Sequence, residues 1–238
     1  MSKPAKHKRP AACIADAPNK VWSWDITYLP SQICGQHFYL YMIVDVFSRK
    51  IVGWSVHEAE SAEHASSLIK QACIDEGVAR NQLTLHSDNG SPMKGATMLA
   101  TLQVLGVMPS FSRPSVSDDN PYSEALFKTV KYHPTFPAIE KFNTIESARK
   151  WCVALVSWYN HQHLHSGLKF ITPHQRHTGE DKKIMEKRKR IYQAARERRP
   201  DRWSGNIRNW KLPSSLTLNP DRKQRISENN EINLLRAA

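Results

Sequence analysis

The sequence predicts an α/β fold in which helices flank a mixed five-stranded sheet. Three runs rich in β-branched and aromatic residues are separated by short turns, which predicts an antiparallel meander over 21–29, 37–47 and 50–57. Two shorter apolar runs follow, each after a stretch with helical periodicity. Strands that alternate with helices are typical of parallel pairing, so we expect strand neighbours of both kinds in one sheet.

The later elements are recognised by the residues at their ends. Ser61 is a favourable N-cap and Gly77 a favourable stop, so a helix is expected between them. Apolar runs at 83–86 and 107–111 are the fourth and fifth strands. Turn-forming residues predict a mobile loop over 112–121, and the stretch 203–218 has a strand-like pattern. Helical periodicity and capping residues predict the remaining helices at 96–105, 123–133, 144–159 and 181–199, the last ended by Pro200.

Net charge is distributed unevenly along the 238 residues. The total is +12, yet residues 11–181 hold 14 basic and 16 acidic side chains, and residues 182–202 hold 10 basic and 3 acidic ones. We therefore divide the chain into a flexible basic arm (1–20), a core (21–180) and an extension (181–238) that contains a basic helix and a small strand-like part. Basic flanks beside a near-neutral body are a common feature of proteins that bind nucleic acid.

Several classes of protein are disfavoured by composition. The longest apolar runs fall short of the roughly 20 residues that a membrane span needs, and the first ten residues lack the apolar core of a secretory signal. The four cysteines form no CxxC pair and are widely spaced, which favours reduced thiols. We therefore expect a cytoplasmic protein.

Three carboxylates need an explanation. Asp25 lies inside the first predicted strand, where an ionised acid is costly unless it is paired, protonated or bound to a metal. Asp88 follows the carboxyl end of the strand at 83–86, the edge at which ligands tend to bind in open α/β sheets. Glu124 begins a helix after the predicted mobile loop. These three acids could converge, although their spacing alone is a weak motif.

The local sequences around these acids resemble those of a known family, the integrase-core DDE transposases of bacterial insertion sequences. The matching segments cover about residues 20–180 and are WSWDITYLP, YLYMIVDVFSRKIVGW, HSDNGSPMKG, SDDNPYSEALFKTVKYH and WYNHQHLHSGLKFITPHQR. The resemblance implies a ribonuclease H-like fold, related to that of retroviral integrases. It also implies that Asp25, Asp88 and Glu124 hold two Mg²⁺ ions, with Mn²⁺ as a substitute, for the cleavage of DNA 3′ ends and strand transfer.

We expect DNA contacts from residues near the triad and from the basic extension. Lys128 and Lys131 follow Glu124 by four and seven residues, which places all three on one helix face. In similar integrases, lysines at this spacing contact phosphates near the reactive end. Asn89 lies beside Asp88 and is a further candidate. In the extension the dense basic run predicts contacts from Lys187, Arg188, Lys189 and Arg190, beside Trp203 and Trp210.

Other acids and histidines have simpler interpretations. Asp45 precedes a tight turn and is expected to accept hydrogen bonds there instead of serving as a fourth ligand. Asp118 and Asp119 are typical of turns or helix caps. Five histidines gather between 161 and 177, but there is no paired CxxC, which disfavours zinc. The resemblance assigns Tyr159, Asn160, His165 and Ser166 to packing and DNA contact, and His163 stands where many relatives carry Arg.

Three functions remain open from the sequence. The first is a DDE transposase that acts on element ends and target DNA as a homo-multimer. The second is a nuclease of the same fold without strand transfer, and the third is a truncated or repurposed DNA-binding remnant. Only 24 residues precede Asp25. End recognition is therefore expected from a separate helix-turn-helix protein, a missing N-terminal part or the C-terminal segment.

Overall fold

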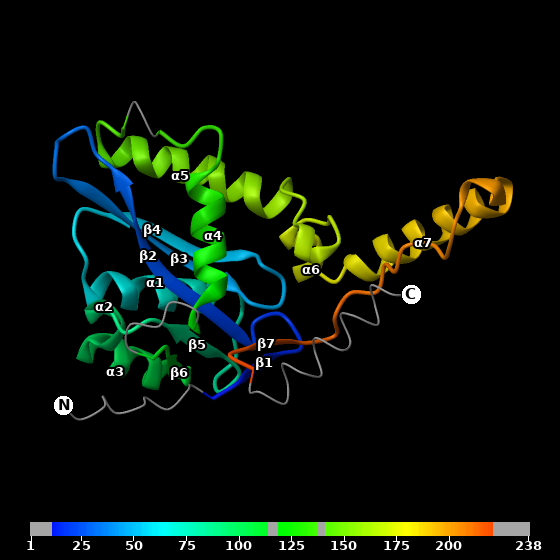
Figure 1. The fold of residues 1–238 in the computed structure, drawn as a ribbon. Helices are drawn as coiled ribbons and strands as arrows, with labels where there is room; N and C mark the ends of the chain where they lie inside the picture. The colour runs from blue at the N-terminus through cyan, green and yellow to red at the C-terminus, as the bar shows by residue number, and fades with distance from the viewer. Residues whose placement is uncertain (1–10, 114–118, 138–140, 221–238) are drawn as a thin grey trace, which may run out of the picture.

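The structure is a computed structural model of the chain and describes residues 11–113, 119–137 and 141–220. Its centre is a five-stranded mixed sheet in the order β4-β3-β2-β5-β6 (Figure 1). Strands β4, β3 and β2 are antiparallel, whereas β2, β5 and β6 run parallel. The predicted meander and the mixed sheet are confirmed. The strands are β2 (Val21–Pro30), β3 (His37–Asp45), β4 (Ile51–His57), β5 (Thr84–Ser87) and β6 (Met108–Phe111).

Two layers of helices cover the two faces of the sheet. Trp22 and Trp24 of β2 pack into one apolar cluster with α1 (Ala62–Asp75) and α3 (Ala96–Leu105). The intervening positions of β2 point to the opposite face, because side chains alternate along a strand. That face carries α4 (Pro121–Lys131) and α5 (Ile145–His161), and its core includes Leu29, Leu126 and Leu155. Each large apolar side chain buried in these clusters contributes about 1.5–3 kcal/mol.

The helix ends follow local sequence signals. The Ser61 hydroxyl accepts a hydrogen bond from the His64 N–H at 3.1 Å, as its N-cap role predicts. Thr144 caps α5 in the same way through the Ser147 N–H. At the end of α3, Gly106 has φ +68°, and a Cβ there would lie 2.9 Å from the Asn81 Oδ1 atom. The helix boundaries therefore lie within two residues of those expected.

The shortest helices were not predicted from the sequence. Periodicity needs a longer window than the four or five residues of α2 (Ser91–Lys94) and α6 (Pro173–His177) provide. The same holds for the 3-10 turns η2 (Ser166–Leu168) and η3 (Pro200–Arg202). Residues 114–118 of the predicted mobile loop lie outside the described residues.

The N-terminal and C-terminal segments pair with each other. β1 (Cys13–Ala15) lies antiparallel to β7 (Leu216–Leu218). A flexible arm was expected over residues 1–20, but residues 13–15 of it form a strand. The side chains of Ala15 and Leu218 are buried against Phe47, which holds this strand on the core. Residues 1–10 lie outside the described residues. Next to β7, the Asn219 side chain donates a hydrogen bond to the Asp119 carbonyl at 3.1 Å.

The basic helix extends away from the sheet. α7 spans Asp181–Arg198, and Figure 1 shows it projecting from the body while the following segment returns beside it. Trp210 of the returning segment is buried with Met185 of α7 and with Ile171. The strand-like pattern predicted for 203–218 is realised only at 216–218, because the residues before it contact α7 and its flanks instead of a sheet.

Candidate active site

Strand register places Asp25 beside Asp88. β2 and β5 are parallel, with Ser23 opposite His86 as the last registered pair. Asp25 and Asp88 each follow that pair by two residues, so Asp25, within β2, lies beside the carboxyl end of β5, which Asp88 follows. Both carboxylates are half-buried, and each uses one oxygen locally. The Ile26 N–H donates to Asp25 Oδ1 at 2.8 Å, and the Gly90 N–H donates to Asp88 Oδ1 at 2.9 Å.

The first turn of α4 is held on β2 next to Asp25. The buried Ser23 hydroxyl donates to the Asn120 side-chain oxygen, and the Asn120 amide donates to the Trp24 carbonyl at 3.3 Å. The Ser123 hydroxyl lies 2.6 Å from the Ser23 hydroxyl. These contacts fix the backbone on both sides of Pro121 and bring Glu124, one residue beyond Ser123, to the strand that carries Asp25.

The charges of neighbouring acids act on Asp25. Burial raises the pKa of Asp25 to about 7, and the negative charge of Asp88 adds to the effect. The hydrogen bond from the Ile26 N–H lowers the pKa, and the charge of Glu124 raises it by less than that. The exposed carboxylate of Glu60 adds a further, smaller contribution. A site that makes ionisation of one of its acids this costly favours a proton or a cation.

The site has the donor chemistry of a hard divalent cation. Its three acids supply only oxygen ligands, which such ions prefer, and their mutual repulsion is what a cation would relieve. Within residues 11–113, 119–137 and 141–220, no three His, Cys, Asp or Glu side chains are close enough together to hold a metal ion as they stand. As the structure describes them, the three acids therefore do not form a closed metal site.

The loop after Asp88 is closely packed. A Cβ at Gly90 would lie 2.8 Å from the Met93 sulfur and 3.2 Å from Asp88 Oδ1, so a larger residue there would require the Met93 side chain to move. The Asn89 amide donates to the Ser112 carbonyl. His86 is buried between the hydroxyls of Ser110 and Ser112. In this arrangement Asn89 links the Asp88 loop to the segment after β6.

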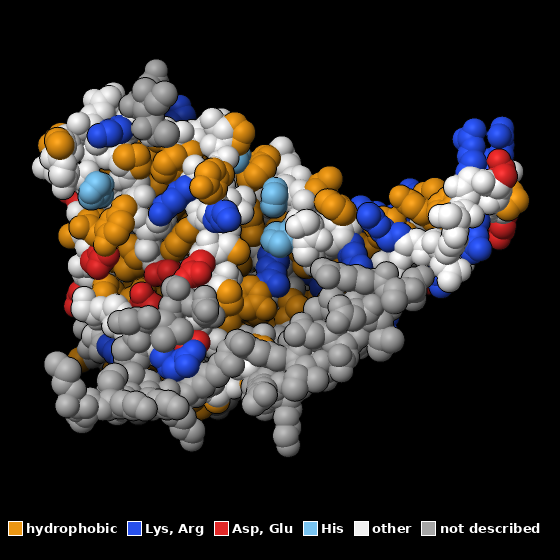
Figure 2. Space-filling model, in the orientation of Figure 1, with side chains coloured by type: hydrophobic (Ala, Val, Ile, Leu, Met, Phe, Trp, Pro, Cys, Tyr) orange, Lys and Arg blue, Asp and Glu red, His pale blue; other side chains and the backbone are white. Residues whose placement is uncertain are grey.

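Lysines follow the acids along α4. Glu124, Lys128 and Lys131 are all exposed on this helix. Figure 2 shows acidic side chains gathered where α4 crosses the sheet, with Lys and Arg side chains further along the same helix. The face that presents the acids thus also presents positive charge.

The basic residues of α7 lie away from the acids. Lys187, Lys189 and Arg190 are exposed on the projecting helix. Arg188 differs, because its guanidinium donates to the carbonyls of Lys169 and Phe170 and lies 5.3 Å from the centre of the Trp210 ring. In this structure Arg188 therefore joins α7 to the preceding loop.

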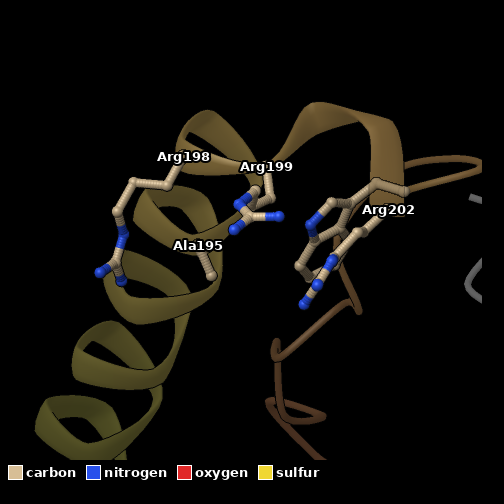
Figure 3. Close-up of a pocket in the computed structure, with 5 residues that line it drawn as sticks. Ala195, Arg198, Arg199 and Arg202 are labelled. Atoms are coloured by element: carbon tan, nitrogen blue, oxygen red, sulfur yellow. The ribbon is translucent and has the colours of Figure 1, made fainter.

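A basic pocket lies at the far end of α7. It has a volume of about 520 Å³, and its lining includes Arg198, Arg199, Arg202 and Trp203. Figure 3 shows the Arg199 guanidinium directed toward the chain that carries Arg202, with Arg198 on the opposite side of the helix. These arginines lie beyond Lys187, Arg188, Lys189 and Arg190, the residues of α7 that the sequence predicts to contact DNA.

Most of the alternative candidates have structural roles. Asp45 is fully buried and accepts hydrogen bonds from the Asn19 N–H at 2.9 Å and from the Ser48 N–H at 2.7 Å, which confirms the turn interpretation. Asp119 is buried and pairs with Arg113, whereas Asp118 lies outside the described residues. Asn160 exchanges two hydrogen bonds of 2.9 Å with the backbone of Ile51, as its packing role predicts.

The histidines between 161 and 177 do not form one cluster. His161 contacts His174 with the two rings tilted by 45°, and His163 stacks with Tyr159. His177 instead contacts Glu76 at 2.8 Å and the Ser48 hydroxyl at 2.9 Å.

Among the described residues, no helix has the length and apolar composition needed to cross a membrane.

Comparison with known proteins identifies the family. Residues 15–117 match a family model described as Integrase core domain, and residues 105–173 match a second model with the same description. The chain belongs to the integrase-core family. This confirms the resemblance on which the site assignment was based.

Curated relatives and solved structures agree with this membership. The transposase for insertion sequence element IS904 of Lactococcus lactis is 35% identical over 67% of this chain and 61% of its own length. A putative transposase for IS986/IS6110 of Mycobacterium tuberculosis is 28% identical over 63% of this chain and 54% of its own length. This integrase-core chain therefore spans little more than half of the length of these relatives.

The structural neighbours confirm the ribonuclease H-like fold. A chain of the simian T-cell lymphotropic virus intasome matches 74% of this chain and 60% of its own length, with 19% identity and a TM-score of 0.57. The HTLV-2 integrase catalytic core domain in complex with magnesium matches 68% of this chain and 97% of its own length, with 18% identity and a TM-score of 0.51.

Proposed function

We propose that this integrase-core protein is the catalytic part of a bacterial insertion-sequence transposase. It cleaves DNA to free a 3′-OH and then transfers that strand to a phosphate of target DNA. The observation that supports the proposal is that Asp25 lies on the strand beside the one that Asp88 follows, where burial and then the charges of Asp88 and Glu124 raise the pKa of Asp25. The family membership supports the same reaction class.

We further propose that the three carboxylates hold two Mg²⁺ ions, with Mn²⁺ as a substitute. When bound, such ions supply activation of the attacking oxygen and stabilisation of the leaving oxygen in an in-line displacement. The protein contributes the ligands and their placement. Asp25 must lose its proton to bind a cation, and Ser23 and Asn120 hold the helix that positions Glu124.

DNA is the proposed partner of the basic surfaces. Lys128 and Lys131 bind phosphates beside the acids and offset the repulsion between DNA and the three carboxylates. Asn89 contributes from the neighbouring loop when its bond to Ser112 is exchanged for one to DNA. We assign the core to residues 21–180 and DNA tracking to the extension 181–238. In the extension, the contacts come from Lys187, Arg188, Lys189 and Arg190.

The assembled state is also part of the proposal. Two element ends must be processed together, which favours a homo-multimer on DNA. Recognition of the end sequence is assigned to a separate helix-turn-helix protein, and the reaction takes place in the bacterial cytoplasm at the nucleoid. Sedimentation of the protein with and without duplex DNA measures the multimer directly.

One experiment tests the reaction. The full chain is incubated with Mg²⁺ and a linear duplex that carries a candidate element end, and joined products are measured. The variant Asp25→Asn is compared with Asp75→Asn, which removes an exposed carboxylate at the end of α1. We expect joining by the wild type and by Asp75→Asn, and its loss in Asp25→Asn and in the presence of a chelator.

The other outcomes separate the competing functions. Equal joining by Asp25→Asn and the wild type would show that the triad assignment is wrong. Cleavage without joining would identify a nuclease of the same fold. DNA binding with neither reaction would identify a DNA-binding remnant.

A further inference from the structure

A second site lies beside α4, around the buried guanidinium of Arg49. The arginine follows the turn after β3 with φ +67°, and its guanidinium carbon lies 3.9 Å from the centre of the Tyr122 ring. Its Nε and Nη1 atoms are buried and have no hydrogen-bond partner among the described residues. A buried cation with two unpaired donors is costly, so an anionic partner would be strongly favoured there.

The arginine lines a pocket of about 330 Å³. Tyr122 and Ala125 of α4 form one wall, and Tyr159 of α5 and His165 form another. Among the described residues that line it, none is acidic. Asp45, the acid whose charge reaches Arg49, already accepts hydrogen bonds from Asn19 and Ser48.

The polar groups of the pocket walls can donate hydrogen bonds. Burial raises the pKa of Tyr159 to about 12, so its hydroxyl keeps its proton. Burial lowers the pKa of His165 to about 4, so the ring is neutral. Its Nδ1 atom accepts from the Gly167 N–H at 3.1 Å, which leaves the proton on Nε2 as a donor. A pocket with these donors and a fixed cation suits a tetrahedral oxyanion.

The position of the pocket points to DNA as the source of that anion. Ala125 directly follows Glu124, about 100° around the helix, and Lys128 and Lys131 continue the exposed row of Glu124. Because Ala125 lines the pocket, a DNA backbone bound along these lysines would run close to it. Figure 2 shows histidine side chains exposed beside α4, on the same face as the acidic and basic side chains.

We propose that the Arg49 pocket binds a backbone phosphate of the DNA on which the active site acts. The proposal rests on the proposed function and adds a fixed anchor beside the acids, at a site separate from the lysine row. The planar guanidinium offers two donors to one phosphate, so the contact fixes the strand's position as well as adding affinity. The carboxylate of a second copy is the competing occupant.

The decisive variants are Ala125→Glu and Ala125→Gln. Position 125 is exposed on α4, and both replacements are good helix formers of similar size. The glutamate places a carboxylate within the pocket, where it pairs with Arg49 and blocks it, whereas the glutamine adds bulk without charge. Thr129→Glu controls for general repulsion, because it adds the same charge one turn further along α4, outside the pocket lining.

Binding to a labelled duplex is measured against salt concentration in the presence of a chelator, so that cleavage does not intervene. We expect Ala125→Glu to lose about tenfold in affinity and about 0.9 in the salt slope relative to Ala125→Gln, as for one lost phosphate contact. Thr129→Glu should lose clearly less. Arg49→Gln should match Ala125→Glu, and the Ala125 pair decides the question if that variant does not fold.

A second readout uses inorganic phosphate alone. At constant ionic strength, phosphate should raise the melting temperature of the wild type and of Ala125→Gln, and should have no such effect on Ala125→Glu. Equal DNA binding by the two Ala125 variants, or equal losses in Ala125→Glu and Thr129→Glu, would overturn the proposal. Unchanged DNA binding with an altered sedimentation coefficient would assign the pocket to a second copy. A wild type that shows the phosphate effect but joins no DNA would contradict only the proposed function.

Discussion

The hydroxyl of Ser23 is expected to control both the stability of the fold and the position of Glu124. The hydroxyl donates to the Asn120 side chain, so its contact with Ser123 requires Ser123 to be the donor. Ser23→Ala removes both bonds and leaves one acceptor and one donor unpaired in a buried site. At about 0.5–1.5 kcal/mol for each bond, the substitution should cost about 1–3 kcal/mol.

Part of this loss is expected to appear at the first turn of α4. A loss of 1.4 kcal/mol there lowers the ratio of anchored to released helix about tenfold. The variant should therefore need more Mg²⁺ for strand transfer and should unfold at lower urea concentration, followed by tryptophan fluorescence. Ser123→Ala should have a similar effect, and the double variant should cost less than the sum of the two.

The control is Ser66→Ala, which removes another buried serine hydroxyl. Ser66 lies on α1, at the opposite face of the sheet, and donates within its own helix to Ala62. Its replacement should leave the Mg²⁺ dependence unchanged. If Ser23→Ala matches Ser66→Ala in both urea midpoint and Mg²⁺ dependence, the hydroxyl network does not hold α4 and the reasoning fails.

Three further perturbations test the charged groups. Because burial and neighbouring acids raise the pKa of Asp25 from 3.8 to about 7, the metal-free folded state keeps a proton that the unfolded chain loses. The free energy of unfolding should fall as pH rises through this range. In urea titrations, Asp25→Asn should gain about 2–4 kcal/mol in this free energy relative to the wild type by pH 8. Parallel pH profiles of the two proteins would contradict this. Asp45→Asn should cost about 2–4 kcal/mol, since an amide cannot accept all of the hydrogen bonds that the buried carboxylate receives; an unchanged melting temperature would count against that role. Burial alone would raise the pKa of Glu76, but hydrogen bonds from His177 and Lys50 lower it to about 2. The stability that Glu76 adds is present above pH 4.5 and is lost as pH falls toward 2. Glu76→Gln should therefore be about 1 kcal/mol less stable than the wild type at pH 6 and equally stable at pH 2. A difference in stability that persists at pH 2 would exclude this linkage.

The sheet could be predicted because its information is local. Runs of β-branched residues, Ser61 and Thr144 as caps and Gly106 as a stop each act over a few neighbouring residues, and the structure confirms the elements that they define. The place of Asp88 after the carboxyl end of a strand was predicted from the sequence, whereas the parallel pairing that sets Asp25 beside it appears only in the structure. Their metal-binding role, and that of Glu124, stays a prediction.

Long-range contacts explain what the sequence did not reveal. Asn120 looks like an N-cap residue, yet its side chain makes no cap bond and contacts β2, 97 positions earlier at Ser23. A serine within a strand carries no signal for such a partner. Arg49 likewise belongs to an ordinary turn sequence, and only the packing of Tyr122 and Tyr159 around it reveals a buried charge.

The pairing of β1 with β7 changes where a minimal fragment of this protein can end. The matches to the integrase core stop at residue 173, which suggests truncation before α7. A fragment that ended at 180 would keep all five strands of the sheet but would remove Leu218 from the cluster around Phe47. It would also lose the Asn219 amide that donates to the Asp119 carbonyl, directly before the N-cap of α4. The helix that carries Glu124 is thus held in part by the residue that follows β7, and a shortened chain that keeps the whole sheet would lose that contact.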